Sequence, residues 1–285
     1  MYIKFENDYQ KLGAVGDPIK QTLSPNLHNF LSEKLDLKCI YMPYRVPEGR
    51  AKDFLEAAKL LEITGFNVTM PHKFAMAELM DELVGDAKVF NAVNVVKIKP
   101  DGKVYGYNTD GSGYMMSIEE QGANVTGKKL VVVGAGGACS SILYNLVTRK
   151  PAQIVLLNRS VDKARALADK YDKNIIVDAF TSENLKKYTA ECDYFMNTSS
   201  LGMVGGDYPD FDFLNVGRKI FVSDVIYRPA CTNLLAKAKE LGHTTVNGMG
   251  MWLYQAILAL EIFAGTEIDK KAAKDILYDE MIKIF

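Results

Sequence analysis

Hydrophobic residues along this 285-residue chain follow two alternating patterns. Short continuous apolar runs, rich in Val, Ile and Tyr, are typical of buried β-strands. Longer stretches, in which apolar residues recur every three or four positions, are typical of amphipathic helices. Because the two patterns alternate almost throughout, the sequence indicates an α/β fold class with mainly parallel sheets.

In the first half of the chain, strand-like runs and helix-like stretches take turns, and a hairpin follows. Strands are expected at 11–16, 39–46 and 64–70, and helices at 24–37 and 49–63. Residues 92–98 and 104–110 flank the turn sequence KPDG and form the predicted hairpin. The first helix is expected to open with Ser24, with Pro25 at its first position.

The pattern changes at 127–150, where a continuous β-branched run leads into a glycine cluster and a helix. The strand expected at 152–158 then completes the start of a dinucleotide-binding βαβ unit. Further strands are expected at 175–180, 194–200, 220–227 and 244–248, and final helices at 249–265 and 269–285. We predict two α/β domains with a cleft between them, residues 1–110 with 251–285 and residues 111–250.

The glycine cluster is a candidate nucleotide site. In VVVGAGGAC, Gly134, Gly136 and Gly137 follow a strand and precede a helix. Glycine lets backbone amides come close to a pyrophosphate at the positive N-terminus of a helix. Cys139 stands where the usual fingerprint has its third glycine, so the pattern is a variant, and a tight turn without a ligand is the alternative. The surrounding strand, helix and second strand favour nucleotide binding.

The tip of the second strand indicates which nucleotide binds. NAD-binding folds usually place an acid there, which accepts a hydrogen bond from the ribose 2′-hydroxyl and repels a 2′-phosphate. This chain has Asn158, Arg159 and Ser160 instead, and a guanidinium is a good partner for a phosphate. Lys163 adds positive charge one turn later, although Asp162 weakens it. NADP is therefore favoured, with a solvated Arg159 as the alternative.

Composition excludes other classes of function. A formal charge of -1 lacks the basic excess of a nucleic-acid-binding protein. The most apolar stretches, 130–147 and 251–265, are interrupted by glycines and by Glu261, so neither is expected to span a membrane. The N-terminus lacks the apolar run of a secretory signal, which favours a cytoplasmic protein. The 4 cysteines and 3 histidines are too scattered for a metal site, and the cysteines are expected to be buried thiols.

Polar side chains gather where elements of the first half end. These residues are Thr22, Ser24, Thr69, Lys73, Asn94 and Asp110. Thr22 and Ser24 lie at a helix entry, where hydroxyls and backbone amides can hold a carboxylate, and a simple N-cap is the alternative for Ser24. In NVTMPHK, Lys73 follows a strand and a proline and can transfer a proton, with His72 as the competing group.

Taken together, these segments resemble a family. In the order seen in shikimate dehydrogenases, the chain contains VGDPIKQTLSPNLHN, NVTMPHK, NAVN, YNTDGSG, GAGGA, NRS, NTSSLGM, DVIYRP and GMGMWLYQA, from about residue 12 to 265. The resemblance implies an N-terminal substrate-binding domain, a Rossmann-type NADP-binding domain and C-terminal helices that return to the first domain. It also implies that Lys73 and Asp110 are the catalytic pair.

The resemblance further implies two sets of contacts. Its substrate contacts fall on Thr22, Ser24, Thr69, Asn94, Tyr227 and Gln255. Its cofactor contacts fall on Gly134, Ala135, Gly136, Gly137, Ala138, Asn158, Arg159, Ser160, Thr198, Ser199 and Gly248, with Val225 and Met251 near the nicotinamide. The chain departs from the family at four positions. Gln21 stands where the family usually has a histidine, and Thr22 where it usually has a serine. Trp252 replaces a usual leucine, and Lys163 replaces a common arginine.

We therefore expect an NADP-dependent oxidoreductase that reversibly reduces 3-dehydroshikimate to shikimate, in the biosynthesis of chorismate and aromatic amino acids. A close alternative is a quinate/shikimate dehydrogenase that uses NAD or NADP. A non-catalytic metabolite-sensing protein is the alternative from another class, and the presence of both Lys73 and Asp110 disfavours it. The expected partner is the small-molecule substrate, without nucleic acid, membrane or metal, and a homodimer is left open.

Overall fold

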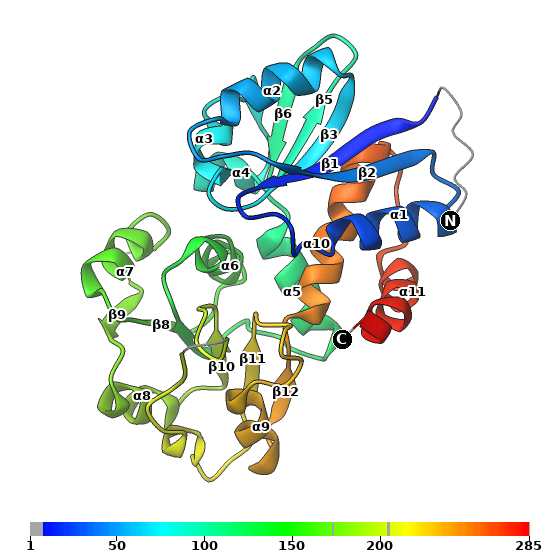
Figure 1. The fold of residues 1–285 in the computed structure, drawn as a ribbon. Helices are drawn as coiled ribbons and strands as arrows, with labels where there is room; N and C mark the ends of the chain where they lie inside the picture. Colours follow the sequence, from blue (N-terminus) through cyan, green and yellow to red (C-terminus); the bar gives the residue numbers. More distant parts are fainter. Residues whose placement is uncertain (1–7, 173, 204–205, 285) are drawn as a thin grey trace. The chain divides into compact units, whose positions relative to one another are not determined.

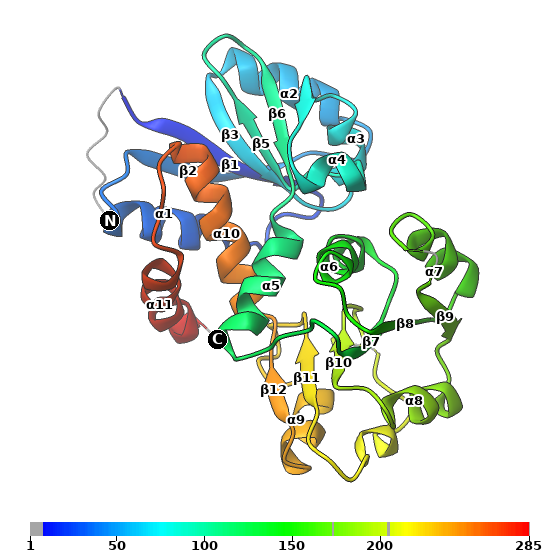
Figure 2. The same ribbon diagram turned by 180° about the vertical axis from the view of Figure 1, so that it is seen from behind.

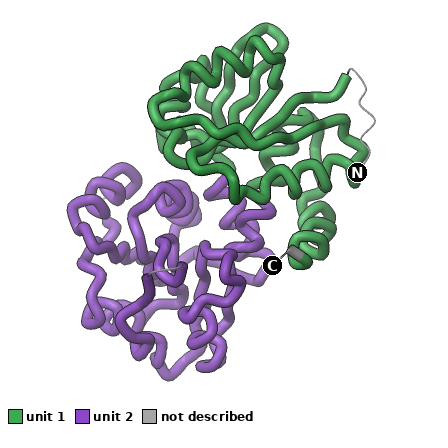
Figure 3. Tube along the Cα trace, viewed as in Figure 1, with its two compact units in different colours: residues 1–109, 255–284 green, residues 110–254, 285 purple. Residues whose placement is uncertain are grey.

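The computed structural model describes residues 8–172, 174–203 and 206–284. The chain folds into two compact units, and unit 1 contains Met1–Thr109 and Gln255–Ile284, whereas unit 2 contains Asp110–Tyr254 (Figures 1 and 3). Within the described residues, each unit has its own 6-stranded sheet covered by helices. The predicted α/β class is therefore confirmed.

Unit 1 contains a mixed sheet. Its strands are β1 (Gln10–Gly16), β2 (Cys39–Arg45), β3 (Ile63–Val68), β4 (Glu82–Leu83), β5 (Val95–Ile98) and β6 (Val104–Tyr107). Their spatial order is β2-β1-β3-β5-β6-β4. Strand β1 runs parallel to β2 and β3, whereas β5 is antiparallel to both β3 and β6. The predicted hairpin is therefore present, and among the described strands of this sheet β5 alone runs antiparallel to the others, so the sheet is mainly parallel as predicted.

Helices cover both faces of the unit 1 sheet (Figure 2). They are α1 (Ser24–Lys34), α2 (Ala51–Leu60), α3 (Lys73–Ala77), α4 (Asp86–Phe90) and the part of α10 (Met249–Ala264) that follows Tyr254. Helix α11 (Lys270–Met281) lies against α1 instead, and η2 (Ile282–Ile284) follows it. On one face, Leu55 of α2 packs in a buried cluster with Phe66 and Val68 of β3. On the other face α10 lies close to β3, because a Cβ atom at Gly65 would be 2.5 Å from the Phe263 ring.

Unit 2 contains a parallel sheet. Its strands are β7 (Lys129–Val133), β8 (Gln153–Asn158), β9 (Ile176–Ala179), β10 (Tyr194–Asn197), β11 (Phe221–Asp224) and β12 (Thr244–Val246). Their order is β12-β11-β10-β7-β8-β9, so the direction of winding reverses where β7 lies beside β10. This is the strand order of dinucleotide-binding folds, in which ligands bind outside the carboxyl ends of the strands at such a reversal.

Helices also cover both faces of the unit 2 sheet. They are α5 (Asp110–Glu120), α6 (Gly137–Val147), α7 (Val161–Ala168), α8 (Ser182–Thr189), α9 (Asn233–Glu240) and η1 (Asp212–Leu214). One buried cluster joins α5, α6 and α7 to the sheet, and a second joins α8, η1 and α9. Val132 of β7 belongs to the first cluster and Val131 to the second. Burial of both faces explains why the strands are continuous apolar runs.

Some local predictions require correction. Helix α1 begins at Ser24 itself, and no side chain caps it, so Ser24 is not its N-cap. Its hydroxyl instead accepts a hydrogen bond from Thr22 Oγ1. The strands expected to reach residues 70 and 110 end at Val68 and Tyr107, because Pro71 lies in a turn closed by the bond from His72 N to the Thr69 carbonyl, and because helix α5 begins at Asp110.

The structure also describes the burial of the cysteines, the length and apolarity of the helices, and the grouping of possible metal ligands. Cys139 and Cys192 are buried as predicted, but Cys39 is half-buried and Cys231 is exposed, which corrects the prediction for these two. Within the described residues, no helix is both long and apolar enough to cross a membrane. In the same part of the chain, no three His, Cys, Asp or Glu side chains are grouped so that they could hold a metal ion.

Candidate active site

In unit 1, the backbone of residues 92–94 connects the polar groups that the sequence singled out. Val93 N donates to the Lys73 carbonyl at 3.0 Å, and Val68 N donates to the Asn94 carbonyl at 2.8 Å. Asn94 N donates in turn to the Tyr107 carbonyl at 3.0 Å. The start of α3, the end of β3 and the end of β6 therefore meet at one short segment.

The Asn94 side chain extends this connection to the residue before Asp110. Its Nδ2 donates to Thr109 Oγ1 at 3.0 Å, and its Oδ1 accepts from Thr109 N at 2.9 Å. Thr109 Oγ1 donates onward to the Gln255 carbonyl at 3.0 Å. Asn94 and Thr109 are both buried. Thr109, the last residue before α5, is thus held within unit 1, a role that sequence analysis missed although the residue lies in the motif YNTDGSG.

The two candidate proton-transfer groups, His72 and Lys73, follow the turn after β3 and have different surroundings. The His72 ring is buried, and its Nε2 lies 2.7 Å from the Val46 carbonyl. Lys73 is the first residue of α3 and is only half-buried, whereas Thr69 is exposed. Because the imidazole is engaged in the core, the geometry favours Lys73 over His72 for proton transfer.

Thr22 and Ser24 form a polar pair at the start of α1. Thr22 Oγ1 accepts from Ser24 N at 3.3 Å and donates to Ser24 Oγ at 3.1 Å. Both residues are half-exposed. The first turn of α1 contains no acidic residue and no capping side chain. Because a helix N-terminus attracts anions, this pair suits the carboxylate predicted to bind here.

In unit 2, the glycine loop lies at the reversal of the sheet. Gly134 has a φ of +107°, and a Cβ atom there would come 2.9 Å from Ser199 Cβ, so only glycine fits. No side chain caps α6, and a Cβ atom at Gly136 or Gly137 would meet nothing within 4 Å. The first amides of α6 are therefore accessible to an outside acceptor, and the loop, which includes Ala135 and Ala138, fits a pyrophosphate.

The loop after β10 is held against β7. Thr198 donates to the Val133 carbonyl from its backbone N at 2.9 Å and from Oγ1 at 2.8 Å. Ser199 Oγ donates to Asn197 Oδ1 at 2.7 Å. Both hydroxyl hydrogens are thus used inside the protein, and Thr198 and Ser199 shape the loop beside Gly134.

The tip of β8 offers positive charge. Asn158 Nδ2 donates to the Ser160 carbonyl at 2.9 Å, and Ser160 Oγ accepts from Lys163 N as the N-cap of α7. Arg159 and Lys163 are both exposed, and neither pairs with an acidic side chain among the residues that the structure describes. Two cations are therefore available for a phosphate.

The remaining predicted contacts of unit 2 meet at a junction between the segment after β11 and the start of α10. Gly248 N donates to the Ile226 carbonyl at 2.9 Å. A Cβ atom at Gly248 would lie 2.0 Å from the Val225 carbonyl oxygen, so this position requires glycine. Met251 packs against the same buried cluster as Val225. Tyr227, on this segment, is half-buried, and burial raises its pKa above the ordinary value of 10.0.

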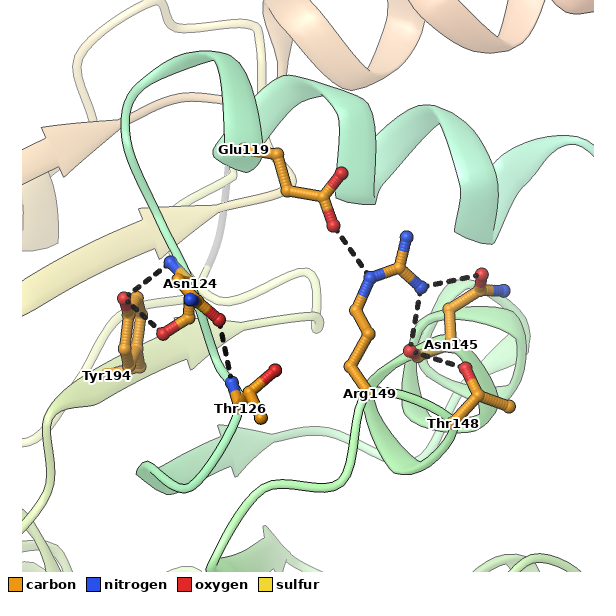
Figure 4. Close-up of polar contacts among 7 residues, drawn as sticks. All are labelled: Glu119, Asn124, Thr126, Asn145, Thr148, Arg149 and Tyr194. Carbon is orange, nitrogen blue, oxygen red and sulfur yellow. Dashed lines mark hydrogen bonds and ion pairs between the residues drawn. The ribbon is translucent and has the colours of Figure 1, made fainter.

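Helix α5, whose first residue is Asp110, is fixed along α6 at two points. A Cβ atom at Gly111 would be 2.4 Å from the Ser141 carbonyl, so the two helices touch through their backbones. Further along, Arg149 Nε donates to Glu119 at 2.6 Å, and its Nη1 donates to the Asn145 carbonyl at 3.0 Å (Figure 4). The helix that carries Asp110 is thus positioned against the helix that begins at the glycine loop.

Asp224 is a buried acid that sequence analysis did not single out. One carboxylate oxygen accepts from Asn197 Nδ2 and from Ile226 N, both at 3.0 Å, and the other accepts from Thr232 Oγ1 at 2.8 Å. Despite these bonds, burial raises the pKa of Asp224 to about 6. The carboxylate joins the end of β10 to the segment after β11, and only the motif DVIYRP marked its position.

Two family models match the chain. The model of the shikimate dehydrogenase substrate binding domain matches residues 14–96, within unit 1. The model described as shikimate / quinate 5-dehydrogenase matches residues 117–203, within unit 2.

Individual relatives resemble almost the whole chain. Shikimate dehydrogenase (NADP(+)) of Alkaliphilus oremlandii is 38% identical over 258 residues, which are 88% of this chain and 90% of that protein. Shikimate 5-dehydrogenase from Listeria monocytogenes, solved with shikimate and NAD, is 31% identical with a TM-score of 0.86, covering 97% of this chain and 99% of that one. Quinate dehydrogenase from Corynebacterium glutamicum, solved with NAD, is 29% identical with a TM-score of 0.85, and the match covers 96% of this chain and 100% of that one.

The Asp224 environment predicts a pH dependence of stability. Because burial raises the pKa from 3.8 to about 6, the folded state holds this proton more tightly than the unfolded state. The resulting stabilisation is complete below the unfolded pKa and is lost as the pH rises through about 6. The Asp224→Asn side chain cannot ionise, so the variant does not lose this stabilisation as the pH rises. The unfolding free energy of the variant minus that of the unmodified protein should therefore increase by up to about 3 kcal/mol between about pH 4 and 7.

Urea unfolding of both proteins across this range measures the difference. A constant difference in unfolding free energy at every pH would contradict the assignment of the titration to Asp224. The comparison isolates this carboxyl, because all other titrating groups are shared by the two proteins.

Proposed function

The chain belongs to the shikimate dehydrogenase family, and we propose that it catalyses the reversible, NADP-dependent reduction of 3-dehydroshikimate to shikimate. One observation carries this proposal. The chain combines Lys73 at a strand–helix turn with a dinucleotide-binding sheet whose glycine loop leads into an uncapped helix. We assign substrate binding to residues 1–110 with 251–285 and NADP binding to residues 111–250. A cytoplasmic location stays a prediction.

NADP binding is assigned to groups at the carboxyl ends of the unit 2 strands. Bound NADPH supplies the hydride that reduces the substrate ketone. The backbone amides of the glycine loop would hold the pyrophosphate, and Arg159 and Lys163 the 2′-phosphate. Val225 and Met251 would line the nicotinamide site.

Proton transfer is the task of the chain's own residues. When the ketone is reduced, its oxygen must receive a proton, and the Lys73 ammonium donates it. In the reverse direction, the neutral Lys73 amine accepts the proton from the alcohol. Asp110 accepts a hydrogen bond from the substrate hydroxyl and orients it, with a share in proton transfer. The contacts that fix the Lys73 backbone and Thr109 supply the positioning that this step needs.

Substrate orientation requires further polar groups. Thr22 and Ser24 bind the carboxylate at the start of α1. The other proposed contacts are Thr69, Asn94, Tyr227 and Gln255. Because Asn94 is already bonded to Thr109, it has a structural role in addition to its contact with substrate.

A quinate/shikimate dehydrogenase is the second candidate. Similarity to quinate dehydrogenase from Corynebacterium glutamicum favours it, since a very similar fold serves quinate there. Quinate lacks the ring double bond of shikimate but has the same carboxylate, so the groups at α1 suit either substrate. The candidates differ in substrate choice and share the proposed roles of Lys73 and Asp110.

Lys73→Ala tests the assignment of the general acid. Turnover should fall by roughly 10²–10⁴-fold with little change in affinity for shikimate, because that is the usual contribution of a positioned acid or base. Lys52→Ala, which changes an exposed lysine of α2, is the matched control and should retain full turnover. Initial rates and binding titrations measure both effects, and turnover of Lys73→Ala within a few-fold of the unmodified enzyme would refute the role.

The hydroxyl pair predicts a different kinetic signature. Replacing both Thr22 and Ser24 with alanine removes two donors to the carboxylate, so KM for shikimate should rise far more than kcat falls. Because each hydrogen bond to a charged group is worth about 1.5–3 kcal/mol, the loss of two should raise KM by roughly 100-fold or more. Steady-state kinetics measures this, and an unchanged KM would mean that the two hydroxyls serve only the local turn.

Arg159→Ala tests cofactor choice. One charge-assisted contact is worth about 1.5–3 kcal/mol, so we expect a preference for NADP over NAD of roughly 10- to 100-fold. The substitution should remove most of it by weakening NADP while NAD is nearly unaffected. Lys239→Ala, which changes an exposed lysine of α9, is the control. Should Arg159→Ala keep the original preference in kcat/KM, the phosphate must be bound elsewhere.

A further inference from the structure

The side chains of Tyr227 and Trp252 form a stacked pair in unit 2. Their ring centroids are 5.1 Å apart and their planes differ by 6°, so the rings are parallel and offset. Offset stacking is a favourable arrangement of two aromatic rings. Both residues are half-buried. The indole therefore covers one face of the phenol, while the pair keeps some exposure.

The backbone on either side of the stack is tightly fixed. Tyr227 directly follows Ile226, whose carbonyl accepts from Gly248 N at 2.9 Å. Trp252 lies in the first turn of α10, where its backbone N donates to the Gly248 carbonyl at 3.0 Å. Gly248 itself fits only because it has no side chain. The two rings thus extend from segments that are bonded to each other through one glycine.

The stack limits the motion of the phenol. A tyrosine ring with an open face can turn about its side-chain torsions, and its hydroxyl then samples several directions. An indole held parallel to the ring removes much of this freedom before any ligand binds. Binding then costs less ordering of the side chain, which is the general advantage of preorganisation.

We propose that Trp252 is a positioning residue for substrate binding, which holds the Tyr227 hydroxyl in the direction where it meets the substrate. The proposal rests on the proposed function, in which Tyr227 contacts the substrate. Trp252 acts through the tyrosine, so its removal should matter only while the Tyr227 hydroxyl is present. This dependence separates positioning from a general effect on folding.

A double-mutant cycle measures the dependence. Trp252→Leu should raise KM for shikimate by roughly 3- to 10-fold, with kcat changed by less than about 2-fold. In a Tyr227→Phe background, the same substitution should change KM by less than about 2-fold. Trp252→Phe preserves an aromatic face and should remain within about 2-fold of the unmodified enzyme. An equal rise in KM in both backgrounds, or a Trp252→Phe enzyme as impaired as Trp252→Leu, would overturn the proposal.

Fluorescence provides a second measurement that needs no substitution of Trp252. The chain contains 1 tryptophan, so its emission reports on this stack alone. Addition of shikimate should change the emission saturably, and Tyr227→Phe should shift the midpoint to higher concentration. Unchanged emission at saturating shikimate, in an enzyme that turns shikimate over, would overturn the role of Trp252. Absence of shikimate turnover in the unmodified enzyme would instead overturn the proposed function itself.

Discussion

The paired hydrogen bonds between the Asn94 side chain and Thr109 are the interaction on which the unit 1 site depends. They join two chain segments 15 residues apart, and both partners are buried, so their polar groups would be costly to leave unpaired. The adjacent Val93 amide holds the carbonyl of Lys73. One buried segment therefore fixes the proposed general acid and the residue that precedes Asp110.

In unit 2, a buried carboxylate joins chain segments through hydrogen bonds, as the buried Asn94 amide does in unit 1. Asp224 and Asn197 join the loop after β10 to the segment after β11, and the contact of Gly134 with Ser199 places the glycine loop beside them. A buried charge is tolerated only when hydrogen bonds compensate for the loss of water, and Asp224 receives three. In both units, polar side chains at strand ends hold the backbone in place beside the groups that we propose to bind ligands.

Much of this arrangement could be predicted from the sequence because it depends on local signals. The apolar run before Gly134 and the KPDG turn each specify their element within a few residues. Helix α5 could not be predicted, because glycines at 111 and 113 lower its intrinsic propensity and its stability comes from packing on α6. The bonds of Thr109 and the stack of Tyr227 on Trp252 could not be predicted either, because no local sequence pattern reveals pairs of residues that only the fold brings together.

The central claim is that the chain selects shikimate as substrate and NADP as cofactor. Initial rates followed through the absorbance of the reduced nicotinamide, with shikimate and with quinate and each with NADP and with NAD, test it most directly. The account predicts that shikimate with NADP gives the highest kcat/KM of the four pairs, at least about 10-fold above shikimate with NAD. Comparable values with NAD and NADP, or a higher value with quinate, would contradict it.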